Sequence, residues 1–296
     1  MMTILVGILE EGLIYAIMAL GVYITYKILD FPDLSVDGTF PMGAALTAIA
    51  IDSGVSPVLT LPLAFSVGAL AGCVTGLIHV KLKVRDLLSG IIVMTALYSI
   101  NLRITGGTAN LPFFDEDTIF SNTFLSQHVP DAIEPYTTIL ILLLIVLICK
   151  LLLDLYMKTR SGYLLRAVGD NDVLVTALAK DKGLVRILGL AIANGFVALA
   201  GCVYCQQKGF FELSIGTGTI VIGLANVIIG TQLLKGLGFI KATTAVIIGS
   251  VIYKGCVSLA IQFGMESNDM KLITAILLLI ILVLSTDRRK KVISHA

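Results

Sequence analysis

The sequence predicts an all-α polytopic membrane protein with about nine transmembrane helices. Three observations predict this fold class: an apolar composition, long apolar runs, and basic residues that gather in alternate loops. Of 296 residues, 57% are hydrophobic and 14% are charged, and the mean hydropathy is +0.97. A soluble domain carries roughly 25% charged residues, so a soluble fold of this size could not hide so much apolar surface. The net charge of +1 says nothing about nucleic acid, but the sequence has no basic cluster with interleaved aromatics, so we expect no nucleic-acid partner.

The apolar runs can be compared with the length needed to cross a lipid bilayer, whose ~30 Å core takes about 20 helical residues. The first run contains Glu10 and Glu11 and follows no basic segment, so we expect a retained span rather than a cleaved signal. The second run is short and polar at its start, which predicts a broken or partial span. The number of spans is therefore open by one. The runs lie near 4–26, 36–51, 57–79, 87–105, 135–156, 185–206, 216–234, 239–263 and 270–286.

The basic residues predict the orientation, because loops on the cytoplasmic side carry an excess of Lys and Arg. Most of the 21 Lys and Arg fall in one alternating set of loops, whereas the opposite set is acidic. We therefore expect the N-terminus outside, the C-terminus in the cytoplasm, and a single transmembrane domain over 1–296. The basic set comprises Lys27, 81–85, 157–186, 235–241 and the tail 288–291.

A charged segment, residues 157–186, interrupts the apolar runs and is called the polar island below. It reads MKTRSGYLLRAVGDNDVLVTALAKDKGLVR and holds six Lys and Arg. We expect Ser161 and Gly162 to break the preceding span. Alanines and aliphatic residues at helical spacing then predict a short amphipathic helix over Val173 to Lys180. Such a helix on the cytoplasmic face is suited to a soluble partner, although a solvated loop helix explains the pattern equally well.

A second polar segment, DLSVDGT at residues 33–39, lies between the first two runs. Ser35 or Thr39 can cap a helix N-terminus, and Pro41 suits the first turn of that helix. One interpretation is a capped turn that starts a short helix. The other is a broken helix beside a transport path.

Polar side chains inside the runs are costly in lipid, so they face a cavity or a partner helix. Interhelical hydrogen bonds explain the asparagines among them equally well. Lys254 would cost ~3 kcal/mol at the centre of a span, so we expect it near the outer end, either extended to the interface or in an ion pair. The candidates for a translocation path are Ser35, Asp37, Asn101, Asn194, Asn226 and Lys254.

Catalytic and metal-binding patterns are not found in the sequence. It contains neither G-x-S-x-G nor H-E-x-x-H, and no G-x-x-x-x-G-K-[ST] that could bind ATP through a P-loop. Cys202 and Cys205 are interpreted as neighbours on one helix rather than as zinc ligands, since no further Cys or His has suitable spacing. We therefore expect no enzyme activity and no metal site. Glycines at 68, 72 and 76 predict close helix packing.

Four segments in matching order resemble a family of bacterial ABC importers. GLIYAIMALG at 12–21 resembles the first span of the branched-chain amino-acid permeases, and DLSVDGT resembles a segment of the related ribose-type permeases. Gly162 with RAVGDN at 166–171 looks like the cytoplasmic motif that both groups share, and 189–201 looks like the small-residue span that follows it. The resemblance covers most of the chain and is nearest to a branch described as tryptophan/tyrosine-type permeases. Asp37 departs from the sugar-permease pattern, and 180–183 departs from the sequence usual after the motif.

The resemblance implies a permease subunit in a bacterial cell membrane, paired with a second permease copy as a homodimer or a heterodimer. It also implies cytoplasmic ABC ATPase subunits, which bind the ATP and Mg²⁺, and an extracytoplasmic substrate-binding protein. This chain itself is then expected to hold no cofactor. The polar island becomes the coupling segment to the ATPase, through Gly162, Arg166, Ala167, Gly169, Asp170, Asn171 and Ala177.

Within that segment, Arg166 and Asp170 are expected to make charge-assisted contacts with the partner, and Gly162 and Gly169 are expected to supply bends. The expected substrate is an amino acid, aromatic by the nearest branch, and the alternative is a sugar or a nucleoside. A different class, a self-contained ion-coupled transporter, predicts buried carboxylates in mid-span. The apolar runs hold almost none.

Overall fold

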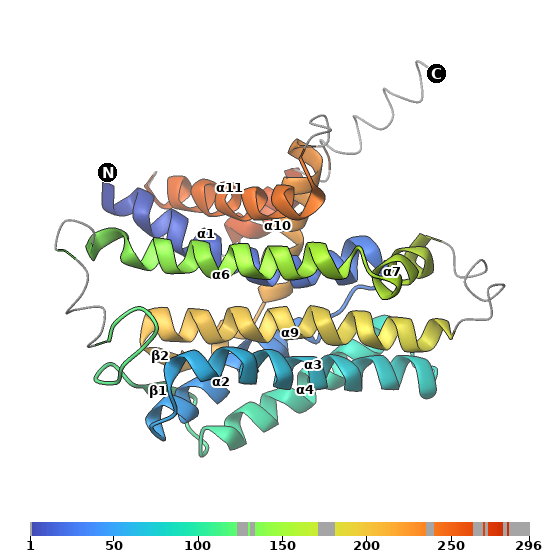
Figure 1. Cartoon of the computed structure of the whole chain (residues 1–296), viewed down its shortest axis with the longest axis horizontal. Coiled ribbons are helices and arrows are strands. Elements are labelled where there is room, and N and C mark those ends of the chain that lie inside the picture. The colour runs from blue at the N-terminus through green and yellow to red at the C-terminus, as the bar shows by residue number, and fades with distance from the viewer. Residues whose placement is uncertain are drawn as a thin grey trace.

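The computed structural model describes residues 2–122, 130, 134–170, 181–234, 240–262, 269, 272–280 and 283. Long helices lie side by side, with a two-stranded antiparallel ribbon at one end (Figure 1). The chain elements are α1 (Met2–Val22), a π-helical segment (Tyr23–Ile28), α2 (Val36–Asp52), α3 (Pro57–Lys81), α4 (Asp86–Ile104), β1 (Asn110–Pro112), α6 (Glu134–Tyr156), α7 (Arg160–Asp170), α9 (Lys182–Lys208), β2 (Phe210–Glu212), a 3₁₀ turn (Leu213–Gly216), α10 (Thr219–Leu233) and α11 (Ala242–Gln262).

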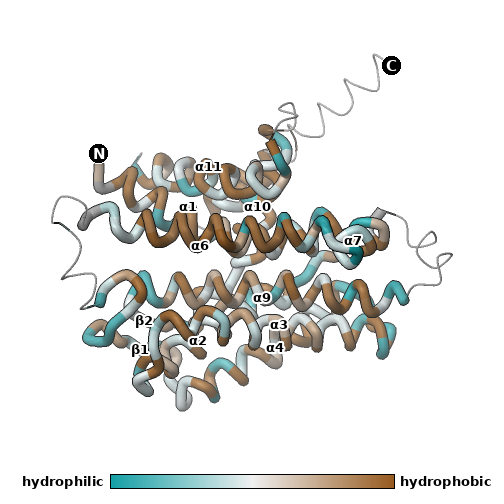
Figure 2. The backbone as a smooth tube through the Cα atoms, in the orientation of Figure 1, coloured by the Kyte–Doolittle hydropathy of each residue, from teal (hydrophilic) through white to brown (hydrophobic). Residues whose placement is uncertain are grey.

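Among the described residues, six helices are long and apolar enough to cross a membrane. Figure 2 shows the apolar colour along α6, with hydrophilic residues gathered toward the ends of the helices. The six are Ile4–Ile28, Pro57–Lys81, Asp86–Ile104, Tyr136–Tyr156, Lys182–Lys208 and Ala242–Gln262. The helices α2, with 17 residues, and α10, with 15, are shorter. The ninth predicted run is described only in part, as helix over 272–280, so nine spans stay a prediction.

Helix α9 is the central element and contacts α1, α2 and α3. Glycines of α3 permit the close contact between α3 and α9, because a backbone can approach closely where side chains are short. A Cβ atom built at Gly68 would lie 2.4 Å from the carbonyl oxygen of Asn194, and one at Gly72 would lie 2.2 Å from that of Leu190. The predicted packing stripe on α3 is therefore confirmed. Cys202 and Cys205 both lie buried in α9 as free thiols.

Two helices begin in the interior of the bundle rather than at its ends. After Ile28 the chain turns back, and Asp33 and Ser35 both hydrogen-bond Asn194, near the middle of α9. From there α2 runs toward the end that carries β1 and β2. Helix α10 begins beside Asp37 and runs toward the start of α11. The short second span predicted from sequence is thus a helix that begins inside the bundle.

Pro41 is not in the first turn of α2, contrary to expectation, because the helix begins at Val36. Proline lacks an N–H, so it cannot bond the carbonyl group four residues earlier. That carbonyl belongs to Asp37, and Gly216 packs against it, with a Cβ built at Gly216 lying 2.1 Å from the oxygen. The missing helical bond therefore leaves a surface on α2 where the 3₁₀ turn docks.

The described basic loops meet at one end of the bundle. Arg186 at the start of α9 lies 3.4 Å from the ring of His79 near the end of α3. Lys241, just before α11, pairs with Asp154 near the end of α6. At the opposite end, β1 pairs with β2, and Lys208 pairs with Glu11. This arrangement agrees with the alternation of basic and acidic loops in the sequence.

The α3–α9 contact can be tested with Gly72→Ala. The added methyl group meets the carbonyl of Leu190 at 2.2 Å, and overpacking of this kind costs typically 1–3 kcal/mol. We expect a lower midpoint of thermal unfolding for the purified protein in detergent. The matched control is Gly255→Ala in α11, where a Cβ has no atom within 4 Å. Equal stability of Gly72→Ala and the wild type would contradict the packing of these two helices.

Candidate functional site

Helix α7 lies within the polar island at the basic end of the bundle (Figure 1). Its inner face, with Leu165 and Val168 buried, repeats at three-residue spacing, while Tyr163 and Arg166 on the outer face are exposed. This is the pattern of an amphipathic helix on a surface. The inner face packs against α9 and the π-helical segment. The basic outer face is therefore available to solvent or to a partner.

Gly162 and Gly169 are both contact residues. Gly162 lies inside the helix, so the bend expected there is wrong, whereas Gly169 lies one residue before the described part of α7 ends, and the bend expected there stays a prediction. A Cβ at Gly162 would lie 2.4 Å from the carbonyl oxygen of Tyr156, and one at Gly169 would lie 1.6 Å from that of Ile28. Their lack of a side chain brings α7 directly onto the backbones of α6 and of the π-helical segment.

The break before α7 falls earlier than predicted. Helix α6 ends at Tyr156 and α7 begins at Arg160, so Ser161 and Gly162 are already helical. Of the other motif positions, Ala167 is half-buried and Asp170 is the last residue of α7. Asn171, Ala177 and the helix predicted over Val173 to Lys180 lie outside the described residues.

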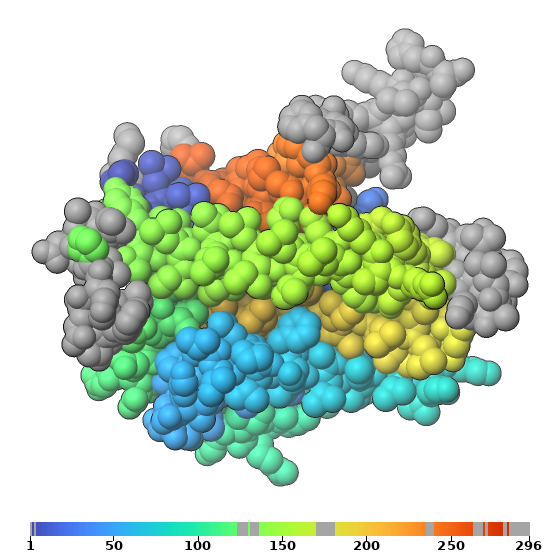
Figure 3. Space-filling model, viewed as in Figure 1, coloured from blue at the N-terminus to red at the C-terminus, as the bar shows by residue number. Residues whose placement is uncertain are grey.

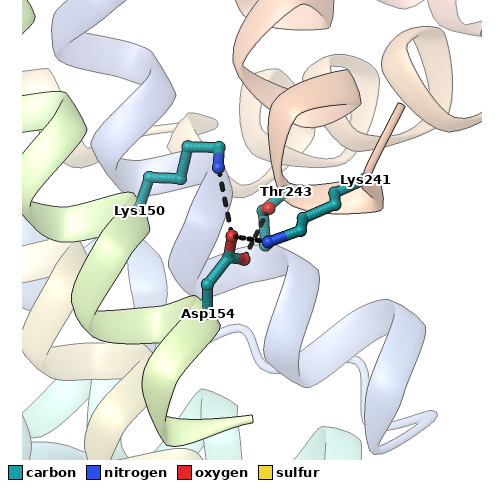
Figure 4. A network of polar contacts seen from close by, with 4 residues as sticks. All are labelled: Lys150, Asp154, Lys241 and Thr243. Atoms are coloured by element: carbon teal, nitrogen blue, oxygen red, sulfur yellow. Dashed lines mark hydrogen bonds and ion pairs between the residues drawn. The ribbon is translucent and has the colours of Figure 1, made fainter. Parts of the chain in front are cut away.

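Asp154 fastens the end of α6 to the start of α11, as Figure 4 shows. Its Oδ2 accepts hydrogen bonds from Lys150 Nζ and Lys241 Nζ, both at 3.1 Å, and its Oδ1 accepts one from Thr243 Oγ1 at 2.8 Å. The carboxylate side chain is only 12% exposed, and Asp154 shares a cavity wall with Arg166. Sequence reasoning missed this cluster, and its only local signal was the spacing of four between Lys150 and Asp154.

Asp33 organises the turn before α2. Its Oδ1 accepts hydrogen bonds from the backbone N–H of Ser35 at 2.9 Å and from Ser35 Oγ at 2.6 Å. Its Oδ2 accepts one from Asn194 Nδ2 at 2.7 Å, and all three residues are fully buried. Ser35 and Asn194 are thus brought together as anchors of the turn. Asp33 is also a buried carboxylate. The apolar runs did not predict it, because Asp33 lies between the first run and the second.

Asp37 joins the two helices that begin in the interior. Its Oδ2 accepts from the N–H of Gly218 at 3.0 Å and its Oδ1 from that of Ile220 at 2.8 Å. A carboxylate at this position satisfies N–H groups that have no partner within α10 and opposes the positive end of the helix dipole. Asp37 also lines a cavity together with Asn101.

The two remaining path candidates lie apart from that cavity. Lys254 Nζ pairs with Glu11 Oε2 at 2.8 Å and sits 4.5 Å from the ring centre of Tyr15, with its side chain 6% exposed. Of the two alternatives for Lys254, the ion pair is the one observed. Asn226 is fully buried in α10, and its side-chain amide has no hydrogen-bond partner within the described residues.

A groove of about 550 Å³ runs between α3, α6 and α9 on the face that Figure 3 displays. Its walls are almost wholly apolar, with Phe65, Ile148 and Phe196 among them. The groove offers few polar groups for recognition of a polar solute, so it differs from the cavity at Asp37.

The family described as branched-chain amino acid transport system / permease component matches residues 4–283. The chain belongs to this permease family. The family match agrees with the resemblance carried by the four sequence segments. As a member of a family of transport permease components, the protein is an integral part of a transport system in the cell membrane.

Individual relatives of this permease span nearly its whole length. A tyrosine transport system permease protein of Clostridioides difficile (strain R20291) is 47% identical over 93% of this chain and 89% of the relative. An uncharacterized protein of Rickettsia prowazekii (strain Madrid E) is 33% identical over 94% and 96%. A ribose import permease protein of Escherichia coli (strain K12) is 24% identical over 97% and 86%. No solved structure matches the permease.

The ion pair of Lys254 can be tested with Glu11→Gln, which leaves a nearly buried ammonium group without its countercharge. We expect a loss of about 1–3 kcal/mol in the free energy of unfolding, measured with the purified permease in detergent. The matched variant is the double substitution Glu11→Gln and Lys254→Met, which removes the stranded charge and should recover the part of the loss that belongs to Lys254, while the loss of the partly exposed Lys208–Glu11 pair remains. No recovery in the double variant would argue against direct pairing.

Proposed function

We propose that the chain is the transmembrane permease subunit of an ATP-driven ABC importer for amino acids, with an aromatic amino acid as the substrate. The observation that carries the substrate class is the 47% identity to a tyrosine transport permease along almost the full chain. The ribose-type relative, at 24%, supports a sugar or nucleoside as the alternative.

Helix α7 is proposed as the element that contacts the ATPase. It presents Arg166 on an exposed face, and its backbone contacts at Gly162 and Gly169 hold the helix against two neighbours. Asp154 ties the helix before α7 to α11. A displacement of α7 would therefore act on α6, the π-helical segment and α11 together. Such a coupled movement suits rigid-body switching between outward and inward openings.

The partners in this proposal are two cytoplasmic ATPase subunits, an extracytoplasmic binding protein, and a second permease copy. The end of the bundle with α7, Arg186 and Lys241 faces the cytoplasm, because basic loops favour that side. The ATP and Mg²⁺ belong to the ATPase. The path candidates of this chain that share a cavity are Asp37 and Asn101.

The function is tested by reconstituting the permease with its ATPase and binding protein in liposomes. We expect ATP-dependent uptake of labelled tyrosine and no competition by a hundredfold excess of ribose. Uptake that requires an ion gradient and no ATPase would overturn the importer class. ATP-dependent uptake of ribose but of no amino acid would support the importer class and show that the proposed substrate is wrong.

The coupling role is tested with Arg166→Glu, which reverses the charge on the exposed face of α7. We expect at least a tenfold loss of both uptake and binding-protein-stimulated ATP hydrolysis, because a charge-assisted contact to the ATPase becomes repulsive. The unfolding midpoint should stay unchanged, since the side chain is exposed. The matched control is Arg85→Glu, an exposed residue just before α4, which should retain uptake. Normal coupling in Arg166→Glu would refute the assignment of α7.

A further inference from the structure

The cavity that Asp154 and Arg166 share lies at the basic end of the bundle, between α6, α7, the π-helical segment and the start of α11. It is called the basic cavity below, and its volume is about 290 Å³. Tyr23, Asp154 and Thr243 in its wall belong to three candidate membrane spans, and each lies near the basic end of its span. The basic cavity is therefore at the level where the spans end, rather than beyond them.

Positive charge exceeds negative charge in the wall of the basic cavity. Among the described lining residues, Lys158, Arg166 and Lys241 are cations, whereas Asp154 is the single carboxylate. That carboxylate already accepts hydrogen bonds from Lys150 and Lys241 (Figure 4). Lys158 and Arg166 form no hydrogen bond or ion pair with any residue that the structure describes. Two cations are therefore left to bind an anion.

The donors around the basic cavity match a phosphate group. The guanidinium group of Arg166 presents its N–H groups in a planar fork that fits two phosphate oxygens, and the ammonium group of Lys158 supplies further donors. The wall residues Tyr23 and Tyr163 each carry a hydroxyl group that can also donate. Hydrogen bonds between ionised groups are roughly twice as strong as those between neutral groups, so an anionic phosphate is favoured over a neutral polar solute.

An apolar stripe on α6 leads to the basic cavity. Helix α6 lies on the surface of the bundle (Figure 3), and Leu144, Leu147 and Leu151 are exposed on one face of it, at spacings of three and four residues. Lys158 comes seven residues after Leu151 and continues this line, and its N–H bonds the carbonyl of Leu155 at 3.0 Å in the turn that follows the helix. Leu147 and Lys158 are ~16 Å apart along the helix axis, which is close to the ~15 Å depth of one leaflet.

A phospholipid matches both features, whereas a soluble partner matches only one. The phosphate of a lipid lies where the spans leave the hydrocarbon core, and an acyl chain extends from it along the apolar stripe. An acidic side chain of a soluble protein would have to enter this level and would leave the stripe uncovered. The two free cations also favour an anionic lipid, because the headgroup of phosphatidylethanolamine carries an ammonium group that they repel.

We propose that the basic cavity binds the phosphate of an anionic phospholipid, with an acyl chain along Leu144, Leu147 and Leu151. Lys158 and Arg166 donate to the phosphate oxygens. In the orientation proposed above, the lipid belongs to the inner leaflet, whose anionic lipids attract basic segments beside the membrane. The inference goes beyond the proposed function, since lipid binding does not depend on what the permease imports.

The test is a titration of the delipidated permease in detergent with dioleoyl phosphatidylglycerol, in which native mass spectrometry counts the bound lipid. We expect saturable binding, and at least fivefold weaker binding of dioleoyl phosphatidylethanolamine. Lys158→Gln removes one free cation from an exposed position and should weaken the affinity for phosphatidylglycerol about fivefold. The matched control is Lys81→Gln, which changes an exposed lysine at the end of α3, outside the cavity wall, and should retain the wild-type affinity.

Two further ligands separate a lipid from a free phosphate. A hundredfold excess of inorganic phosphate should not displace the dioleoyl lipid, and dihexanoyl phosphatidylglycerol should bind more weakly because its chains are too short to cover the stripe. Displacement by inorganic phosphate, or equal affinity for the two chain lengths, would overturn the assignment to a lipid.

Lys158→Gln also separates the lipid from a soluble partner. Equal binding of the two dioleoyl lipids, or wild-type affinity for phosphatidylglycerol in Lys158→Gln, would contradict the proposal. A variant that binds the lipid normally but the ATPase more weakly would assign the basic cavity to the soluble partner instead. Because the titration needs neither the ATPase nor the substrate, failure of the lipid site leaves the proposed import function standing, and failure of import leaves the lipid site standing.

Discussion

The fold depends on two carboxylates that allow the chain to turn inside an apolar bundle. Backbone that leaves a helix in such surroundings exposes N–H and C=O groups, and each must find a partner within the protein. Asp33 accepts from the N–H of Ser35, and Asp37 accepts from two N–H groups at the start of α10. These acceptors supply partners to backbone groups where α2 and α10 begin in the interior, beside the cavity that Asp37 lines.

The same turn connects α7 to the interior. Gly169 lets α7 contact the carbonyl of Ile28, and Leu29 follows at once and packs with Leu165 around Gly189 of α9. Only a few residues separate Leu29 from Asp33, whose carboxylate bonds Asn194 in the middle of α9. A displacement of α7 therefore reaches the turn through backbone contacts and one hydrogen-bonded side chain. Close-packed contacts of this kind have little room to absorb movement.

Local sequence patterns predicted the helices well where apolar runs are long. The runs at 57–79, 87–105 and 135–156 correspond to α3, α4 and α6, because lipid leaves a long apolar segment few alternatives to a helix. The glycine stripe of α3 could also be predicted, since a spacing of four residues places the three glycines on one face of a helix. Asp37 and Asn101 could be selected as polar residues beside or within apolar runs, but nothing in the sequence placed them in one cavity.

The features that sequence reasoning missed depend on contacts that no local sequence pattern records. Gly162 was interpreted as a helix breaker, whereas its contact with Tyr156 makes it a packing residue inside α7. The pairing of Asp154 with Lys241 joins residues far apart in the chain. Strands β1 and β2 have three residues each, and segments that short carry no periodic signal.

The ribbon of β1 and β2 also makes the two ends of the bundle mechanically unequal. Backbone hydrogen bonds between the strands tie the segment after α4 to the segment after α9, and the ring of Phe211 is fully buried beneath them. At the opposite end no strand pairing is found among the described residues, and the links there include the ion pair of Asp154 with Lys241 and the close contacts of Gly162 and Gly169. If the ATPase acts on α7, as proposed, its force arrives at the end of the bundle opposite the ribbon. In that case the backbone pairing of β1 with β2 would restrain the far end, and the helices would be expected to move most at the end with α7.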